Sequence, residues 1–166
     1  MLKVYLACWF TDQGVMKAKA DELKTINIDC TSSWVNEEHQ PQRREGNYKL
    51  DEMVFKKSRA IEDIRDIDRA DVLVQFTRER DNPAPGGGRI FEAGYAYGKG
   101  KHVVFCGPTE NVFCLLPDTK RFDTWEEVKN YLLDYEYIRS KAQARTLQGY
   151  ATLNDPLGLG GTLRLS

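Results

Sequence analysis

Residues 71–106 read DVLVQFTRERDNPAPGGGRIFEAGYAYGKGKHVVFC and alternate between apolar runs and segments of other composition. The apolar runs 71–76 and 102–106 are typical of strands buried on both faces of a sheet. Between them, residues 79–89 are rich in proline, glycine and asparagine, which indicates a loop. Residues 89–99 carry small side chains that let a helix approach a sheet closely. The stretch therefore predicts a strand, a loop, a helix and a second strand.

A second unit of the same kind precedes this one. Residues 2–8 (LKVYLAC) and 26–30 (INIDC) have the composition of strands, and apolar side chains recur at helical spacing between residues 12 and 23. The first ten residues, MLKVYLACWF, are apolar but short, and no cleavage site of small residues follows them. They predict a first strand rather than a signal peptide, in a chain that is expected to start at Met1.

Two further helices are predicted. Residues 35–50 are polar and lack periodicity, which indicates a loop, and the stretch that follows places four apolar side chains on one helical face: Met53, Ala60, Ile64 and Ile67. Thr124 and Glu127 match a capping box, which predicts that a helix begins there. The alternation of strands and helices indicates an α/β domain with a mostly parallel sheet and right-handed crossovers.

The length of the chain fits a single domain. A chain of 166 residues can bury roughly two thirds of its unfolded surface around one core. We expect this domain to occupy residues 1–138. Residues 139–166 have weak periodicity and predict an extended carboxyl-terminal arm or a disordered tail.

The composition excludes several classes of function. The formal net charge is −1, from 24 basic and 25 acidic residues, so no strong field attracts a nucleic acid polymer. No apolar run approaches the roughly 20 residues that a membrane-spanning helix needs. No metal-binding spacing is present among the four cysteines, Cys8, Cys30, Cys106 and Cys114. We therefore expect a cytoplasmic protein that binds a small molecule, without a membrane and without a metal or cofactor.

The junction between the glycine run and the following helix is the candidate centre of chemistry. Ligands of open α/β sheets bind beyond the carboxyl ends of the strands, where Gly86–Gly88 and Glu92 are expected. Glycines let a ligand approach the backbone, and a helix start offers free N–H groups to an anion. Glu92 is expected in the first helical turn, where an acidic residue can simply complement the dipole. Among apolar and aromatic neighbours, its carboxylate is also suited to attack an anomeric carbon.

Four stretches of the chain resemble the nucleoside 2-deoxyribosyltransferase family, which also includes hydrolytic nucleoside monophosphate N-glycosidases. They are YLACWF at 5–10, EDIRDIDRADVLVQF at 62–76, GGGRIFEAGYAYGKGKHVVF at 86–105 and GPTENVFCLLPDTKRFDTWEEV at 107–128. The likeness covers residues 2–132 in order and spacing, and is closest to the short versions found in phage and bacterial genomes. It implies a flavodoxin-like (Rossmann-like) five-stranded sheet with helices on both faces, and a homodimer or higher homo-oligomer.

The resemblance also implies roles for three catalytic residues. Glu92 matches the glutamate that acts as nucleophile or stabilises the oxocarbenium ion, and Tyr5 matches the tyrosine that holds that glutamate in place. Asp63 matches the aspartate that contacts the sugar or helps to protonate the leaving base. The helical wheel favours Asp63, because it places Asp66 further toward solvent. A core role for Tyr5 and a surface role for Asp63 remain the plain alternatives.

The chain departs from the family at the positions that bind substrate. The transferases carry an aspartate six residues before the nucleophile, where this chain has Gly86, and the monophosphate glycosidases have serine there. Those glycosidases also place a serine and an arginine after the first strand, where this chain has Trp9, Phe10, Thr11 and Gln13. Phosphate binding would then fall to Gly86, Gly87, Gly88, Arg89 and Asn111, the last from a neighbouring subunit.

Two tryptophans are further candidate contacts to the substrate of the expected reaction. Trp34 could stack on a base or pack in the core, and Trp9 is a second candidate contact to substrate. The expected reaction is cleavage of the N-glycosidic bond of a 2′-deoxynucleoside or its 5′-monophosphate, which releases the free base. Deoxyribosyl transfer between bases, a nucleotide-binding or sensing protein without catalysis, and cleavage of a ribonucleotide are the alternatives.

Overall fold

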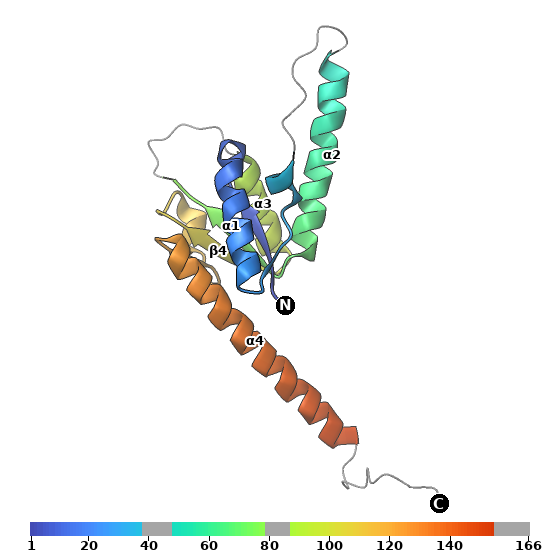
Figure 1. The fold of residues 1–166 in the computed structure, drawn as a ribbon, viewed down its shortest axis with the longest axis vertical. Helices are drawn as coiled ribbons and strands as arrows, with labels where there is room; N and C mark the ends of the chain where they lie inside the picture. Colours follow the sequence, from blue (N-terminus) through green and yellow to red (C-terminus); the bar gives the residue numbers. More distant parts are fainter. Residues whose placement is uncertain (38–47, 79–86, 155–166) are drawn as a thin grey trace, which may run out of the picture. The chain divides into compact units, whose positions relative to one another are not determined.

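The computed structural model describes residues 1–37, 48–78 and 87–154 of the chain (Figure 1). The chain divides into two compact units, Met1–Lys129 and Asn130–Ser166, and every described strand belongs to the first. No helix in the described ranges is both long enough and apolar enough to span a membrane.

The first unit is built on a parallel sheet. Within the described part of the chain it has five strands in the order β2-β1-β3-β4-β5. They are β1 (Lys3–Ala7), β2 (Asp29–Cys30), β3 (Val72–Phe76), β4 (His102–Cys106) and β5 (Lys120–Phe122). This is the strand order of flavodoxin-like proteins, whose ligands bind at the switch point between β1 and β3. The predicted α/β, flavodoxin-like fold is therefore confirmed.

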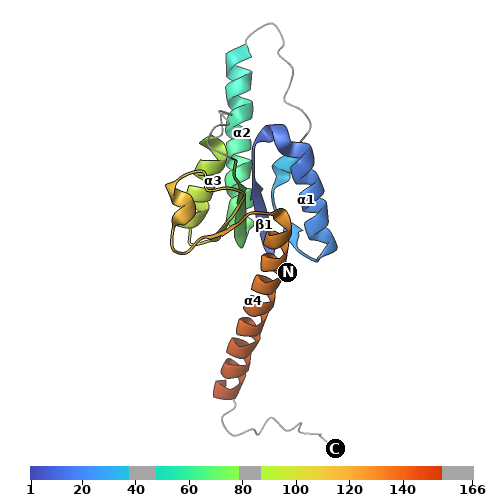
Figure 2. The same ribbon diagram turned by 90° about the vertical axis from the view of Figure 1, so that its left-hand side faces the viewer.

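Helices cover both faces of the sheet. α1 (Gln13–Thr25) lies on one face, and α2 (Tyr48–Arg69) and α3 (Gly87–Gly98) lie on the other (Figure 2). All residues of β3 are buried, as expected for an apolar central strand between two helical layers. Short 3-10 helices lie in three of the connections: η1 (Phe10–Asp12), η2 (Ser33–Asn36) and η3 (Val112–Leu115).

The capping box predicted at Thr124 begins helix α4 (Trp125–Asn154). The backbone N–H of Thr124 donates to Oε2 of Glu127 at 2.9 Å, and the N–H of Glu127 donates to Oγ1 of Thr124 at 3.3 Å. The helix continues to Asn154 and so includes residues 139–154 of the predicted carboxyl-terminal arm. The rest of the predicted tail, residues 155–166, lies outside the described residues.

Two further elements differ from the sequence prediction. The sequence marks no strand at β5, because its three residues, KRF, form an edge strand that is mostly exposed. On α2, Met53 is 67% exposed, whereas Ile67, which was predicted to share a helical face with it, is fully buried. The last turns of α2 therefore provide its packing against the sheet.

Candidate active site

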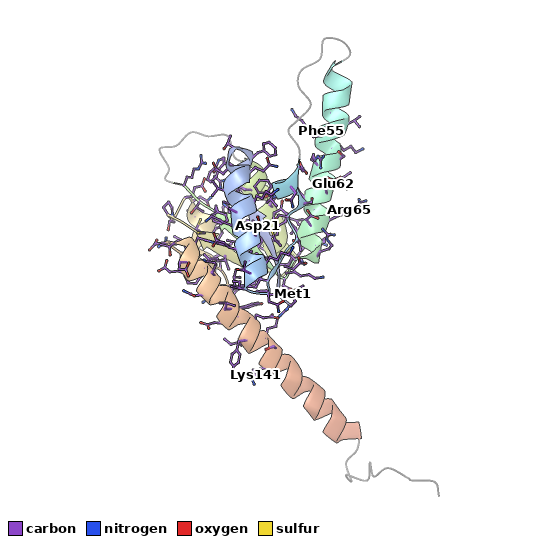
Figure 3. The ribbon with its side chains drawn as sticks, viewed as in Figure 1. Met1, Asp21, Phe55, Glu62, Arg65 and Lys141 are labelled. Carbon is purple, nitrogen blue, oxygen red and sulfur yellow. The ribbon has the colours of Figure 1, made fainter. Side chains whose placement is uncertain are left out.

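A small cavity opens at the carboxyl end of β1, where α2, α3 and η2 come together. Its volume is about 160 Å³, and it is lined by Cys8, Phe10, Trp34, Glu37, Phe55, Arg59, Asp63 and Glu92. The cavity lies at the end of the sheet where flavodoxin-like proteins bind ligands. Phe55 enters the lining from α2, the helix on which Figure 3 also labels Glu62 and Arg65.

A wider, open groove of about 800 Å³ adjoins this cavity along α2 and η2. The two share Glu37 and Arg59, and the groove is otherwise lined by Ser33, Asn36, Glu62, Arg65, Asp66, Asp68 and Arg69. Among the described residues that line the groove, none is aromatic or aliphatic. Pockets for small molecules are lined mainly by apolar and aromatic side chains, so we place the candidate site in the smaller cavity.

Two of the three residues predicted to be catalytic line this cavity, and the third lies close to both of them. Glu92 from α3 and Asp63 from α2 both line it. Tyr5 from β1 is fully buried, and its hydroxyl lies close enough to both carboxyl groups to affect their ionisation. The fold therefore brings a buried phenol and two partly buried carboxyl groups into one site.

Both carboxyl groups have raised pKa values. The pKa of Glu92 is raised to about 8, first because burial disfavours the charged form and then because of the negative charge of Asp63. Tyr5 and Arg89 act in the opposite direction. The pKa of Asp63 is raised to about 6, first by burial and then by the charge of Glu37. The two groups interact, so they titrate as a pair that carries one proton between about pH 6 and pH 8.

The hydroxyl of Tyr5 stays protonated beside this pair. Its pKa is raised far above the ordinary value, first by burial and then by the charges of Glu92 and Asp63. Within the described residues the hydroxyl makes no hydrogen bond of standard geometry, although it lowers the pKa of both carboxyl groups. An unpaired buried hydroxyl costs about 1–3 kcal/mol, so we expect it to donate to whichever carboxyl group is ionised.

The raised pKa of Glu92 predicts a dependence of stability on pH that Glu92→Gln removes. The folded-state pKa of about 8 lies above the ordinary value of 4.5, so the folded state binds this proton more tightly than the unfolded state does. The resulting stability is fully present below about pH 4.5 and is lost as the pH rises to about 8. Between pH 5 and pH 9, we expect the unmodified protein to lose on the order of 3 kcal/mol that the variant keeps.

Urea unfolding at both pH values measures this difference in the free energy of unfolding. Glu126→Gln changes an exposed glutamate at the start of α4 and serves as the matched control. The control is expected to follow the unmodified protein. The same pH dependence in all three proteins would show that the carboxyl group of Glu92 is not desolvated.

The position of Glu92 within its helix differs from the prediction. α3 begins at Gly87, so Glu92 is its sixth residue and lies in the second turn rather than the first. Gly87 and Gly88 are exposed at the helix start, and a Cβ on either would meet open space. Gly86 lies outside the described residues. The free N–H groups of the helix start are therefore not the partners of the Glu92 carboxyl group, and burial dominates its ionisation.

Asp66 is buried, which contradicts the helical-wheel argument used for Asp63. It is only 3% exposed, and its carboxylate accepts hydrogen bonds from the backbone N–H of Ser33 at 2.7 Å and from Arg69 at 2.5 Å. The wheel placed it toward solvent because the sequence gives no sign that η2 packs over this side of α2. Asp66 joins η2 to α2, and Asp63 is the aspartate that lines the cavity.

Arg89 and Trp9 contact each other rather than the cavity. The guanidinium of Arg89 is 3% exposed and forms a bidentate ion pair with Glu110, with Nη1 to Oε2 at 2.8 Å. It lies 3.7 Å from the centre of the Trp9 ring, over which Arg78 also lies at 4.0 Å. The structure therefore does not bring these two predicted substrate contacts to the cavity.

The other two predicted contacts have different positions. Trp34 is 7% exposed and lines the cavity, and its Nε1 donates to the carbonyl oxygen of Leu6 at 2.9 Å. The hydrogen bond fixes the indole ring, which lies beside Phe10 with 6.5 Å between ring centres. Asn111 precedes η3, and its side chain accepts a hydrogen bond from the N–H of Phe113 at 2.9 Å. Asn111 is not among the described residues that line the cavity.

Several residues of the lining were not singled out from the sequence. Arg59 donates to Glu37 at 2.6 Å and to Glu62 at 2.7 Å, and its guanidinium lies 4.9 Å from the centre of the Phe55 ring. The spacing of Arg59 and Asp63, four residues apart on one helix, could have indicated a shared face. Nothing in the sequence indicated that Glu37 lines a site, because it lies near the start of an aperiodic polar stretch.

The fold is shared with solved structures. No protein family model matches the chain, and no curated protein matches its sequence. A solved 2-deoxyribosyltransferase from the psychrotolerant bacterium Bacillus psychrosaccharolyticus is 26% identical and superposes with a TM-score of 0.52, over 78% of this chain and 91% of that one. A conserved protein from Enterococcus faecalis V583 is 18% identical, with a TM-score of 0.48 over 78% and 96% of the two chains. The first similarity supports, at the level of the fold, the resemblance to the nucleoside 2-deoxyribosyltransferase family.

Proposed function

We propose that this protein cleaves the N-glycosidic bond of a 2′-deoxynucleoside, with Glu92 as the nucleophile. The observation that supports this most directly is the presence of Glu92 and Asp63 in one partly buried cavity beside the Tyr5 hydroxyl. The similarity to a 2-deoxyribosyltransferase suggests deoxyribosyl transfer or glycosidic cleavage as the class of reaction. The ring of Trp34 would contact the base or the sugar.

The proposed reaction has two steps. In the first, the carboxylate of Glu92 forms a bond to the anomeric carbon while the bond to the base breaks and its electron pair leaves with the base. Asp63 donates a proton to the base, which then leaves as a neutral molecule. In the second, water attacks the anomeric carbon while the bond from that carbon to Glu92 breaks and its electron pair returns to the carboxylate; Asp63 accepts a proton from the water, and deoxyribose is released. Covalent capture by Glu92 divides one difficult displacement into two easier steps.

Transfer to a second base is the competing reaction, and the solved transferase favours it. It differs only in the second step, where a base in place of water attacks the anomeric carbon. We favour hydrolysis because the aspartate that the family's transferases carry six residues before the nucleophile is Gly86 in this chain. Incubation of a 2′-deoxynucleoside with and without an acceptor base, followed by chromatography, separates the two. A new nucleoside formed only with acceptor would establish transfer.

The pH dependence of catalysis follows from the shared proton. The proposed mechanism needs Glu92 ionised and Asp63 protonated, which is the less populated form of the pair with one proton, because the pKa values of about 8 and about 6 place that proton mainly on Glu92. We therefore expect kcat/KM to rise through about pH 6, to fall above about pH 8 and to be greatest between them. Initial rates of base release between pH 4 and pH 10 measure this profile. Activity that stays constant across that range would contradict the assignment of either group.

The charges at the cavity favour a nucleoside over a nucleotide. Arg59 is the cation among the described residues of the lining. Its positive charge is already paired with the carboxylates of Glu37 and Glu62. The lining also carries the carboxyl groups of Asp63 and Glu92, which would repel a phosphate dianion.

We therefore expect kcat/KM for a 2′-deoxynucleoside to exceed that for its 5′-monophosphate by about tenfold or more, which corresponds to about 1.4 kcal/mol. Competition between the two substrates in one mixture, with chromatography of the released bases, gives the ratio directly. Raising the salt concentration should reduce the preference, because it screens the repulsion. A preference for the monophosphate would instead support the hypothesis that the substrate is a 2′-deoxynucleoside 5′-monophosphate.

The homo-oligomer and the cytoplasmic location remain predictions. The exposed apolar side chains of α3 and η3 favour the predicted homo-oligomer, and the largest exposed fractions belong to Phe91, Val112, Phe113 and Leu115. Free cysteines at all four positions agree with the predicted cytoplasmic location.

A further inference from the structure

Arg89 is held rigidly one helical turn before Glu92. It is the third residue of α3, and residues three apart on a helix lie on the same side of it. Its guanidinium is paired with Glu110, which follows β4, through two hydrogen bonds. With its amide oriented to satisfy its neighbours, Gln75 on β3 accepts from Nη1 of Arg89 at 2.9 Å and donates to the Arg89 carbonyl oxygen at 3.2 Å.

The Trp9 ring completes this enclosure. Trp9 follows β1 and is 7% exposed, and the Arg89 guanidinium lies 3.7 Å from the centre of its ring. Arg78 lies 4.0 Å from the centre of the same ring and is paired with Asp12. The Arg89 charge therefore has a fixed position set by β1, β3, α3 and the segment after β4.

Stability alone is a weak reason for a buried ion pair of this kind. Removing an arginine and a glutamate from water costs several kcal/mol per ion, and their attraction often only balances that cost. Arg89 and Glu110 are 3% and 18% exposed, so the pair bears much of this cost. A fixed charge in a poorly solvated region does, however, act on nearby ionisable groups more strongly than it would in water.

Besides Glu110, Glu92 is an ionisable group on which this charge acts. Among the described groups, Tyr5 faces Glu92 from β1, Asp63 faces it from α2, and Arg89 is on its own helix. Cys8, Glu37 and Arg59 line the same cavity. Asp63 raises the pKa of Glu92, and Arg89 is the cation that lowers it.

We propose that Arg89 is a positioning residue whose fixed positive charge favours the ionised, nucleophilic form of Glu92, and that Glu110 limits how much of that charge Glu92 experiences. The catalytic consequence rests on the proposed function, whereas the effect on ionisation does not. With one proton shared by the pair, a more strongly ionised Glu92 leaves that proton on Asp63, which needs it as an acid. The ion pair thus sets the balance between the two carboxyl groups.

The proposal predicts opposite effects of removing the two partners. Arg89→Met removes the cation and leaves Glu110, so the pKa of Glu92 should rise by about 0.5–1 pH unit. Glu110→Gln leaves the cation without its counter-charge, so the pKa of Glu92 should fall by a similar amount. Arg89→Lys keeps the charge and should restore most of the original value. Arg78→Gln removes the other cation over Trp9 and should leave the Glu92 titration unchanged.

Carbon-13 NMR of protein labelled at glutamate carboxyl carbons measures the titration of Glu92 directly, and the signal is assigned as the one missing in Glu92→Gln. Circular dichroism checks that each variant is folded. If Arg89→Met does not fold, Glu110→Gln and Arg89→Lys still test the sign and the dependence on charge. An unchanged titration in Glu110→Gln, or shifts in the same direction in Glu110→Gln and Arg89→Met, would overturn the proposal.

The pH profile of base release supplies the link to catalysis. Each variant should move the limb of kcat/KM that Glu92 governs in the same direction as its NMR titration. A purely structural role would lower the rate at every pH without moving the limb. If the unmodified protein releases no base, the proposed function fails while the NMR result still decides the role of Arg89.

Discussion

Replacement of Glu92 by glutamine is expected to reduce the rate of base release from a 2′-deoxynucleoside by at least about 10³-fold. Glutamine keeps the size of the side chain but cannot supply the electron pair of a carboxylate to the anomeric carbon. The cavity would still hold substrate through Trp34, Phe10 and Phe55, so binding should change little. The loss should therefore appear in kcat rather than in the dissociation constant.

Two measurements separate this loss from misfolding. Calorimetric titration with a deoxynucleoside should give similar affinities for Glu92→Gln and the unmodified protein, and Glu126→Gln should retain normal rates. Mass spectrometry of rapidly quenched reactions should find the sugar on the peptide that contains Glu92 in the unmodified protein only. Binding without base release in the unmodified protein would instead favour the alternative of a nucleoside-binding protein without catalysis.

The strands of the fold were predictable where burial on both faces requires a continuous run of apolar residues. β3 and β4 are continuous apolar runs because helices cover both faces of the sheet at its centre. β5 lies at the edge, pairs with β4 alone and needs no apolar run, so its three residues carry no periodic signal. α4 continues past residue 138 although its later residues show weak periodicity, because a helix does not require a single apolar face.

The candidate site was predictable in its carboxyl groups but not in their surroundings. Glu92 and Asp63 were identified from motifs that keep their spacing along the chain. The partner of Arg89, however, is Glu110, which lies 21 residues away on the far side of β4. No local sequence pattern indicates such a pair, so Arg89 was assigned to the binding of a phosphate. The burial of Asp66 escaped prediction for the same reason, since its partner Ser33 belongs to a distant 3-10 helix.

Replacement of Asp63 by asparagine is expected to have an effect that depends on the leaving group. A purine or pyrimidine base leaves poorly as an anion, and a positioned acid is typically worth about 10²–10⁴ in rate. Asparagine fits the same space but is not an acid, so base release from 2′-deoxyadenosine should fall by about 10²-fold or more. A base that already carries a positive charge, as in 7-methyl-2′-deoxyguanosine, leaves without a negative charge and should be released at close to the normal rate.

The ratio of the two rates identifies the role of Asp63. A residue that only contacts the sugar would slow both substrates equally when it is changed, because both contain the same deoxyribose. Loss of the acid would slow only the substrate that needs protonation, and it would also remove the fall in kcat/KM above pH 8. The Asp63 charge raises the pKa of Glu92, so Glu92 should titrate below about pH 8 in the variant. Equal slowing of both substrates would leave Glu92 as nucleophile and transfer the role of acid to water.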